Sequence, residues 1–146
     1  MCNMNPRNTA FFAYIQNNFI VCKEMFGKEK ALEIMAKSLE IGLKGAYDNS
    51  GFTRGNPQDF TRVLKERDNA VGLHVEFPEI SENKIVYRFH DDPFPNLKEH
   101  ATAEEIDGTY MKFKVIYLLG DGWTYKTTKH LWNVDEYTEY VIERKN

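Results

Sequence analysis

The chain has little cysteine, with Cys2 and Cys22 alone. Their spacing matches neither a CxxC pair nor a disulfide framework. Cys22 lies in an apolar helical stretch, which predicts a buried thiol and not a metal ligand. A chain of 146 residues buries enough surface to fold without disulfides or a structural metal. Unpaired thiols suit a reducing compartment, so we expect a cytoplasmic protein.

Long apolar runs and an excess of basic residues are also missing. No apolar stretch approaches the ~20 residues of a membrane-spanning helix, and residues 1–9 lack the basic region and apolar run that are expected of a signal peptide. The formal net charge is −3, with lysine and arginine scattered along the chain. These features predict neither a membrane partner nor a nucleic-acid partner. P-loop, dinucleotide and Ser-His-Asp signatures are absent from the sequence as well.

Helical periodicity dominates the first half of the chain. Apolar residues repeat at helical spacing from Thr9 to Phe26 and from Lys28 to about Tyr47. Asn56 followed by Pro57 is typical of a helix start, and Gly72 is typical of a helix end. The sequence therefore predicts three consecutive helices.

Two-residue alternation follows the third helix. Residues 73–77 and 85–89 alternate apolar and polar side chains across a short polar link, which predicts an antiparallel hairpin. Pro78 cannot donate to a ladder, so it marks a strand end or an edge strand. Residues 123–132 and 137–142 have the composition of two further strands.

The segment 105–119 fits two patterns. Met111, Phe113 and Val115 alternate with lysines, as in a strand, but the apolar residues also repeat at helical spacing. Thr102, with a glutamate three residues later, matches a capping box that starts a helix at the next residue. The segment is therefore either a strand or a helix.

Helices followed by antiparallel strands predict an α+β fold, with N-terminal helices packed on an antiparallel sheet. The length fits one domain spanning residues 1–146. Ten phenylalanines, eight tyrosines and two tryptophans predict a well-filled core or an aromatic-lined pocket for a small molecule.

The densest polar cluster is His90, Asp91 and Asp92, at the end of the second hairpin strand. A carboxylate pair beside an imidazole can activate water or bind a divalent cation, which makes these residues the candidate catalytic site. The same composition is typical of an Asp-rich turn in which each carboxylate bonds its own backbone.

Four other side chains are candidate ligand contacts. Arg88 can pair with a ligand carboxylate, or it can cover the sheet with its stem. Trp123 and Tyr140 can line a pocket or fill the core. His130 can act as a base in a pocket or face solvent.

Three segments of the sequence resemble a known family in their order and spacing. They read GKEKALEIMAKSLEIG at 27–42, FTRVLKERDNAVGLHVEFPEISENKIVYRFHDDPF at 60–94 and TTKHLWNVDEYTEYVIER at 127–144. Together they resemble the L-2-amino-thiazoline-4-carboxylic acid hydrolase family, over about residues 11–144. The resemblance implies helices on an antiparallel sheet around a small-molecule pocket, similar to 4-vinyl-reductase-type ligand-binding domains. It also implies a helix over 105–119.

Two positions depart from the family pattern. Asp92-Pro93 stands where the family usually has Cys-Pro, and Val134-Asp135 with Thr138 stands where it usually has Gly-Asp and Cys. A thiolate is a strong nucleophile and a soft metal ligand, and neither a carboxylate nor a hydroxyl replaces it. Any chemistry that used those sulfurs is therefore absent here.

Two functions follow from these observations. The resemblance implies a hydrolase-like protein that binds a small molecule and opens a C–N or C–S bond of a ring, with water activated at His90, Asp91 and Asp92. The replaced cysteines favour the alternative, a non-catalytic sensor or binding module for a small molecule. A homo-oligomer is expected if an apolar helix surface is left exposed.

Overall fold

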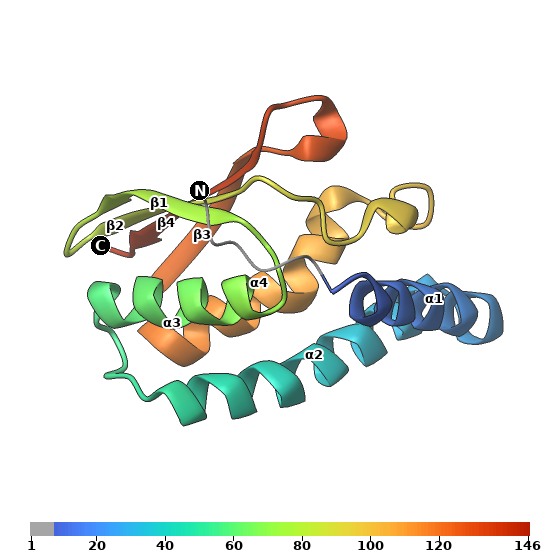
Figure 1. Cartoon of the computed structure of the whole chain (residues 1–146), viewed down its shortest axis with the longest axis horizontal. Helices are drawn as coiled ribbons and strands as arrows, with labels where there is room; N and C mark the ends of the chain where they lie inside the picture. The colour runs from blue at the N-terminus through green and yellow to red at the C-terminus, as the bar shows by residue number, and fades with distance from the viewer. Residues whose placement is uncertain (1–7) are drawn as a thin grey trace.

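The structure, a computed structural model, describes residues 8–146 and places the helices on one side of a sheet (Figure 1). Residues 1–7 lie outside the described residues; they include Cys2 and most of the N-terminal segment that lacks a signal-peptide pattern. The elements follow in the order α1 (Thr9–Phe26), α2 (Lys28–Ser50), α3 (Pro57–Ala70), β1 (Val75–Ile80), β2 (Lys84–Phe89), η1 (Pro95–Leu97), α4 (Ala103–Leu119), β3 (Trp123–Lys129), η2 (Leu131–Asn133) and β4 (Thr138–Arg144).

The four strands form an antiparallel sheet in the order β1-β2-β4-β3. In its centre Tyr87 of β2 lies opposite Tyr140 of β4, and Arg88 lies opposite Glu139. Because side chains alternate along a strand, Tyr87, Phe89 and Tyr140 face the helices and are buried, whereas Arg88 and Glu139 face the other side. The predicted α+β class, with N-terminal helices on an antiparallel sheet, is confirmed.

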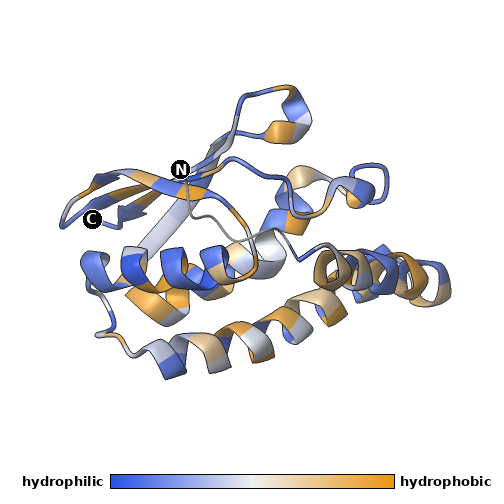
Figure 2. Cartoon of the chain, in the orientation of Figure 1, coloured by the Kyte–Doolittle hydropathy of each residue, from blue (hydrophilic) through white to orange (hydrophobic). Residues whose placement is uncertain are grey.

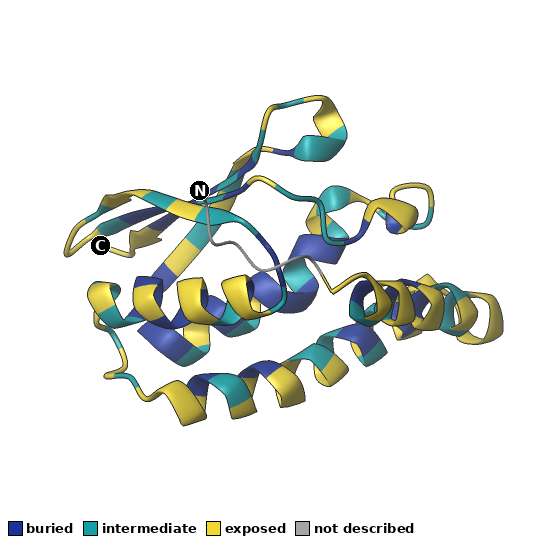
Figure 3. Cartoon of the chain, in the orientation of Figure 1, coloured by how far each residue is buried: buried dark blue, intermediate teal, exposed yellow. Residues whose placement is uncertain are grey.

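The helices form a layer over the inner face of the sheet (Figure 1). α3 packs against β1 and α4 packs against β3, while α2 covers α4 and α1 packs against α2 and η1. Apolar side chains from all four helices and the strands join in one core, and the buried segments in Figure 3 lie where these layers meet. The hydropathy colours of Figure 2 show apolar residues continuing along α1, which lies at one end of the molecule. No helix among residues 8–146 is both long enough and apolar enough to cross a membrane.

Local side-chain chemistry sets the helix starts. The Asn8 side chain accepts a hydrogen bond from the Phe11 amide at the start of α1, and Asn56 caps α3 with Pro57 in its first turn. Thr102 and Glu105 form the reciprocal pair of a capping box at α4. These satisfied amides are the physical reason why the three starts were predictable from sequence.

The segment 105–119 belongs to a helix, which decides between the two sequence patterns. Met111, Val115 and Leu118 lie on one buried stripe of α4, whereas Lys112 is exposed. Lys114, which the strand-like alternation grouped with the polar residues, is buried against the core. The alternation arose because a lysine occupies a core-facing helical position.

Some predicted boundaries and environments are wrong. The strand expected to reach Trp132 ends at Lys129, because the backbone then turns into η2, where the His130 ring accepts a hydrogen bond from the Trp132 amide. Cys22, expected to be a buried thiol, is half-buried, with its Sγ 3.7 Å from Asn18 Oδ1. The expectation for Pro78, a strand end or an edge strand, is confirmed, because Pro78 lies within the edge strand β1, in the irregular stretch of its pairing with β2.

Candidate functional site

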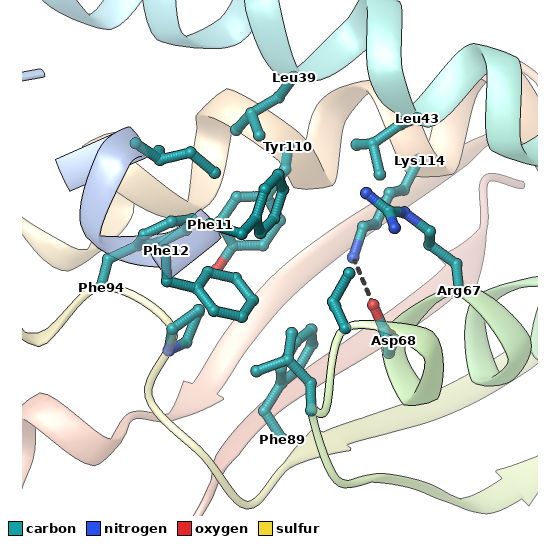
Figure 4. A pocket seen from close by; sticks show the side chains of 14 residues that line it. Phe11, Phe12, Leu39, Leu43, Arg67, Asp68, Phe89, Phe94, Tyr110 and Lys114 are labelled. Carbon is teal, nitrogen blue, oxygen red and sulfur yellow. Dashed lines mark ion pairs between the residues drawn. The ribbon is translucent and has the colours of Figure 1, made fainter. Parts of the chain in front are cut away.

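A pocket lies between the helical layer and the sheet, beside the side chains shown in Figure 4. We call it the inner pocket; its volume is about 60 Å³. Most of its wall is apolar, and three charged side chains interrupt it. Its lining residues are Phe11, Phe12, Ile15, Leu39, Leu43, Arg67, Asp68, Val71, Leu73, Phe89, Pro93, Phe94, Tyr110 and Lys114.

A second hollow, which we call the outer groove, lies beside the inner pocket between α1 and α2. Its volume is about 300 Å³, and its wall includes Tyr14, Asn18 and Met35. The two hollows share five lining residues, namely Phe11, Ile15, Leu39, Leu43 and Arg67. A cavity of about 150 Å³ in another protein accepts benzene, so a ring-sized molecule needs the inner pocket together with part of the outer groove.

A buried polar cluster forms the floor of the inner pocket. The Lys114 Nζ donates a hydrogen bond to the Tyr87 hydroxyl at 3.2 Å and lies 3.8 Å from an Asp68 carboxylate oxygen. The Tyr87 hydroxyl in turn donates to the other oxygen of Asp68. The Lys114 and Asp68 side chains are each 5% exposed, so this ion pair is shielded from water.

Aromatic rings surround the ammonium group of Lys114. Its Nζ lies 5.4 Å from the ring centre of Tyr87, 5.2 Å from that of Phe89 and 5.1 Å from that of Tyr110. Ring faces attract a cation in such an apolar setting, which offsets part of the cost of burying the charge.

Burial shifts the ionisation of this cluster. Burial lowers the pKa of the Lys114 ammonium, because the charged form loses its water; the Asp68 charge opposes this shift and the Arg67 charge adds to it. Burial likewise raises the pKa of the Tyr87 hydroxyl well above its ordinary value, and the neighbouring Asp68 charge adds to the effect. The tyrosine therefore stays protonated and can donate to Asp68.

The end of α3 holds Asp68 in place. Its backbone carbonyl accepts hydrogen bonds from the amides of Val71 and Leu73, as the chain turns through Gly72 at a φ of 81°. Positive φ suits glycine, so this turn lets the chain leave α3 and enter β1 at once. The turn fixes Asp68 on the core side of α3, next to Leu64 one turn earlier.

A second polar cluster adjoins the first through Tyr110. The Tyr110 hydroxyl bonds both the Asp107 carboxylate and the Tyr140 hydroxyl, each at 3.0 Å. The His130 Nε2 lies 3.4 Å from the same Asp107 oxygen. These side chains line a hollow of about 10 Å³, which is room for about one water molecule.

The predicted catalytic residues have separate partners. The His90 ring is exposed and lies 3.0 Å from a Glu76 oxygen, on the far side of the sheet from the inner pocket. Asp91 bonds the amide and the ring of His74. Asp92 accepts from the Trp132 indole at 2.6 Å and from the Phe94 amide at 2.9 Å. Asp91 and Asp92 line the small hollow of the second cluster, whereas His90 does not.

The four predicted ligand contacts are also divided. Arg88 lies on the outer face of the sheet, where it pairs with Glu139 at 2.6 Å and covers the Tyr137 ring. Trp123 is buried and lines none of the hollows described above. His130 and Tyr140 come together in the second cluster. His130 is 7% exposed, so the expectation that it faces solvent is wrong.

The positions that depart from the resembling family lie close to each other. Asp92 and Thr138, which stand in the places of the two cysteines, line the same small hollow. Val134, which stands in the place of glycine, has a φ of 64°. A divalent cation was also considered for the candidate catalytic site. In the described part of the chain, no three His, Cys, Asp or Glu side chains form a group that could hold a metal ion.

Comparison with known proteins gives one informative result. No family model matches the sequence, and no curated protein matches it. Among solved structures, the fold is similar to the crystal structure of the phenol-responsive sensory domain of the transcription activator PoxR with phenol. The TM-score is 0.60 at 12% identity, over 99% of this chain and 76% of that chain. This likeness shows a shared fold, and membership in the thiazoline hydrolase family has no support from these comparisons.

The buried charged residues of the inner pocket, Asp68 and Lys114, were not among the predicted site residues, although the sequence contains a signal for them. Asp68 follows Phe60 and Leu64 at helical spacing, and Lys114 lies between Met111 and Leu118 at helical spacing. Both charges therefore occupy core-facing positions of amphipathic helices. A buried charge at such a position requires a partner, and that requirement could have pointed to this pair.

Proposed function

We propose that this chain is a small-molecule-binding module of the sensory type, which holds a small and largely apolar organic molecule in the inner pocket and the adjoining outer groove. The observation that carries the proposal is a buried ammonium, that of Lys114, in the wall of an otherwise apolar pocket. Ligand sites typically combine apolar walls with a few polar groups that orient the guest.

The hydrogen bonding of Lys114 leaves room for a ligand acceptor. An ammonium has three donors, and among residues 8–146 the Lys114 Nζ makes one hydrogen bond, to Tyr87. The Asp68 oxygen at 3.8 Å is too far for a second hydrogen bond. A ligand oxygen that reached this ammonium would satisfy a buried donor, which is a strong source of orientation.

The position of α1 supports a sensory role. Phe11, Phe12 and Ile15 of α1 form one wall of the inner pocket, and the remaining walls belong to α2, α3, α4, β2 and the segments that flank β1 and η1. A guest between them would tie α1 to the rest of the core. The PoxR domain, which has the same fold, is phenol-responsive, and this supports an aromatic guest for the present chain.

The hydrolytic alternative has less support. Water activation at His90, Asp91 and Asp92 needs the three side chains to meet at one point, but they contact Glu76, His74 and Trp132 respectively. Their role as catalytic residues stays a prediction. His90 lines a wide hollow of about 780 Å³ beside Glu76 and His74. Asp91 and Asp92 line the separate hollow of about 10 Å³. Neither of these hollows, nor the inner pocket or the outer groove, is lined by all three side chains. The pocket lined by Lys114 is therefore the better-supported site.

The proposal is tested by titrating phenol into isotope-labelled protein and following backbone amide resonances. We expect shifts concentrated at the residues that line the inner pocket. Leu39→Trp places bulk between the inner pocket and the outer groove, so it should abolish the shifts. Ile41→Trp is the matched control, because Ile41 is on the same helix but is 77% exposed and lines neither hollow.

Two outcomes would overturn the proposal. One is the absence of any pocket shift with phenol and with the benzoate series described below. The other is a set of shifts that Leu39→Trp and Ile41→Trp leave equally intact, since the molecule would then bind elsewhere. A thermal unfolding curve for each variant establishes that it is folded before its titration is interpreted.

A further inference from the structure

The charges in the wall of the inner pocket do not balance. Arg67 and Lys114 are cationic and Asp68 is anionic, while the other lining side chains carry no charge. The Asp68 carboxylate already accepts the Tyr87 hydroxyl and faces the Lys114 ammonium. One positive charge in the pocket wall is therefore left without a counter-charge.

Arg67 carries that unmatched charge. In the part of the chain that the structure describes, its guanidinium forms no hydrogen bond or ion pair, and its central carbon lies over the Phe11 ring, 5.8 Å from the ring centre. Arg67 lines both the inner pocket and the outer groove, and Figure 4 shows its side chain directed toward Lys114 and Leu43. A planar guanidinium with free donors is suited to bind a carboxylate through two parallel hydrogen bonds.

Lys114 adds a second set of donors on the pocket floor. Its ammonium makes one hydrogen bond, to Tyr87, and its nitrogen lies 5.2 Å and 5.1 Å from the ring centres of Phe89 and Tyr110. The Arg67 charge acts on Lys114 strongly enough to contribute to its lowered pKa. An anion placed near both groups would relieve their mutual repulsion and satisfy donors of both.

We propose that the pocket selects a small organic acid in its anionic form, with one carboxylate at Arg67 and Lys114 and an uncharged apolar body among the aromatic and leucine side chains. This inference rests on the proposed function and adds the charge of the ligand to it. A zwitterion such as a free amino acid is disfavoured, because its ammonium would enter a pocket that already carries excess positive charge.

A matched series of three probes tests this inference. Benzoate, benzamide and benzamidine have nearly the same shape, and they carry a negative charge, no charge and a positive charge. In amide-resonance titrations of the full chain, we expect benzoate to bind about tenfold or more tightly than benzamide. We expect benzamidine to produce no shifts in the pocket.

Two arginine variants show which residue supplies the preference. Arg67→Gln keeps a polar side chain of similar length, and it should reduce the preference for benzoate over benzamide to about twofold or less. Arg62→Gln is the control on the same helix, since Arg62 pairs with Asp59 and Glu66 and lines neither hollow, so it should leave the preference unchanged. Because Arg67 makes no ion pair, its replacement should not unfold the protein.

The outcomes separate this inference from the function on which it rests. Equal pocket shifts with benzoate and benzamide would overturn charge selection and leave the binding role standing. Tightest binding of benzamidine would overturn it too, because Asp68 would then dominate the site. A benzoate preference that survives Arg67→Gln would refute the assignment to Arg67. If neither phenol nor any of the three probes shifts the amide resonances of the pocket residues, the binding role itself would be overturned.

Discussion

Tyr47 and Tyr140 are both completely buried, but their hydroxyl groups differ in hydrogen bonding. The Tyr140 hydroxyl bonds Tyr110 at 3.0 Å, whereas the Tyr47 hydroxyl has no partner within the described residues. We expect Tyr140→Phe to lower the free energy of unfolding by about 1–2 kcal/mol. Tyr47→Phe should leave that free energy unchanged or raise it by up to about 1 kcal/mol, because it removes an unsatisfied buried group.

Urea denaturation of the two variants and the parent protein measures this difference. Both substitutions remove one oxygen from a buried ring, so the loss of volume is matched and the hydrogen bond is the variable. If Tyr47→Phe cost as much as Tyr140→Phe, the Tyr47 hydroxyl would have to bond a partner such as a buried water molecule.

At the scale of elements, the sequence predicted what local chemistry decides. The caps at Asn56 and Thr102 act within one turn of helix, and the alternation in β2 and β4 reports which face is buried, so both could be derived without knowing the fold. The inner pocket could not be derived in this way. Asp68 belongs to α3, Tyr87 to β2 and Lys114 to α4, and they meet only because these three elements pack together.

The same distinction explains the candidate catalytic residues. His90, Asp91 and Asp92 are adjacent in sequence, but the end of β2 directs them to three different partners. His130 gave no sequence signal for burial, because its partner Asp107 comes from α4. Side chains from distant segments, and not neighbours along the chain, create both polar clusters of this fold.

The connection between β3 and β4 contains a strained residue that allows an element-scale prediction. Val134 ends η2 in the left-handed region, with φ 64° and ψ 20°, and its side chain is 93% exposed. A β-branched residue is disfavoured there by about 1–2 kcal/mol, and glycine removes this strain. The greater conformational entropy of glycine in the unfolded chain cancels part of the gain. Val134→Gly should therefore stabilise the protein by up to about 1 kcal/mol.

Val134→Ala is the control for this turn. Alanine removes the branch but keeps the Cβ atom that causes the strain, so its gain in thermal midpoint should be smaller than that of glycine. Because the side chain is almost fully exposed, neither change removes core packing. A lower thermal midpoint for Val134→Gly than for the parent would show that the strain is absent in solution.

For the molecule as a whole, buried tyrosines determine the response to alkaline pH. Burial raises the pKa of Tyr47, Tyr87, Tyr110 and Tyr140 well above the ordinary value of 10.0. In the unfolded chain these groups lose their protons near pH 10, so above that pH the folded state binds more protons and stability falls as pH rises. Lys114 acts in the opposite sense, because its lowered pKa makes stability rise with pH between its folded pKa and 10.5.

Each tyrosine that stays protonated costs about 1.4 kcal/mol of stability per pH unit above its unfolded pKa, and a domain has about 5–15 kcal/mol to lose. Four such groups therefore predict cooperative alkaline unfolding within about one to three pH units above 10. Tyrosinate absorbance measures this directly: of the eight tyrosines, these four should ionise only together with the loss of folded circular dichroism. Tyr110→Phe should flatten the fall in stability, whereas Tyr14→Phe, at a 72% exposed position, should not. Smooth ionisation of all eight in the folded protein would contradict the burial on which both polar clusters depend.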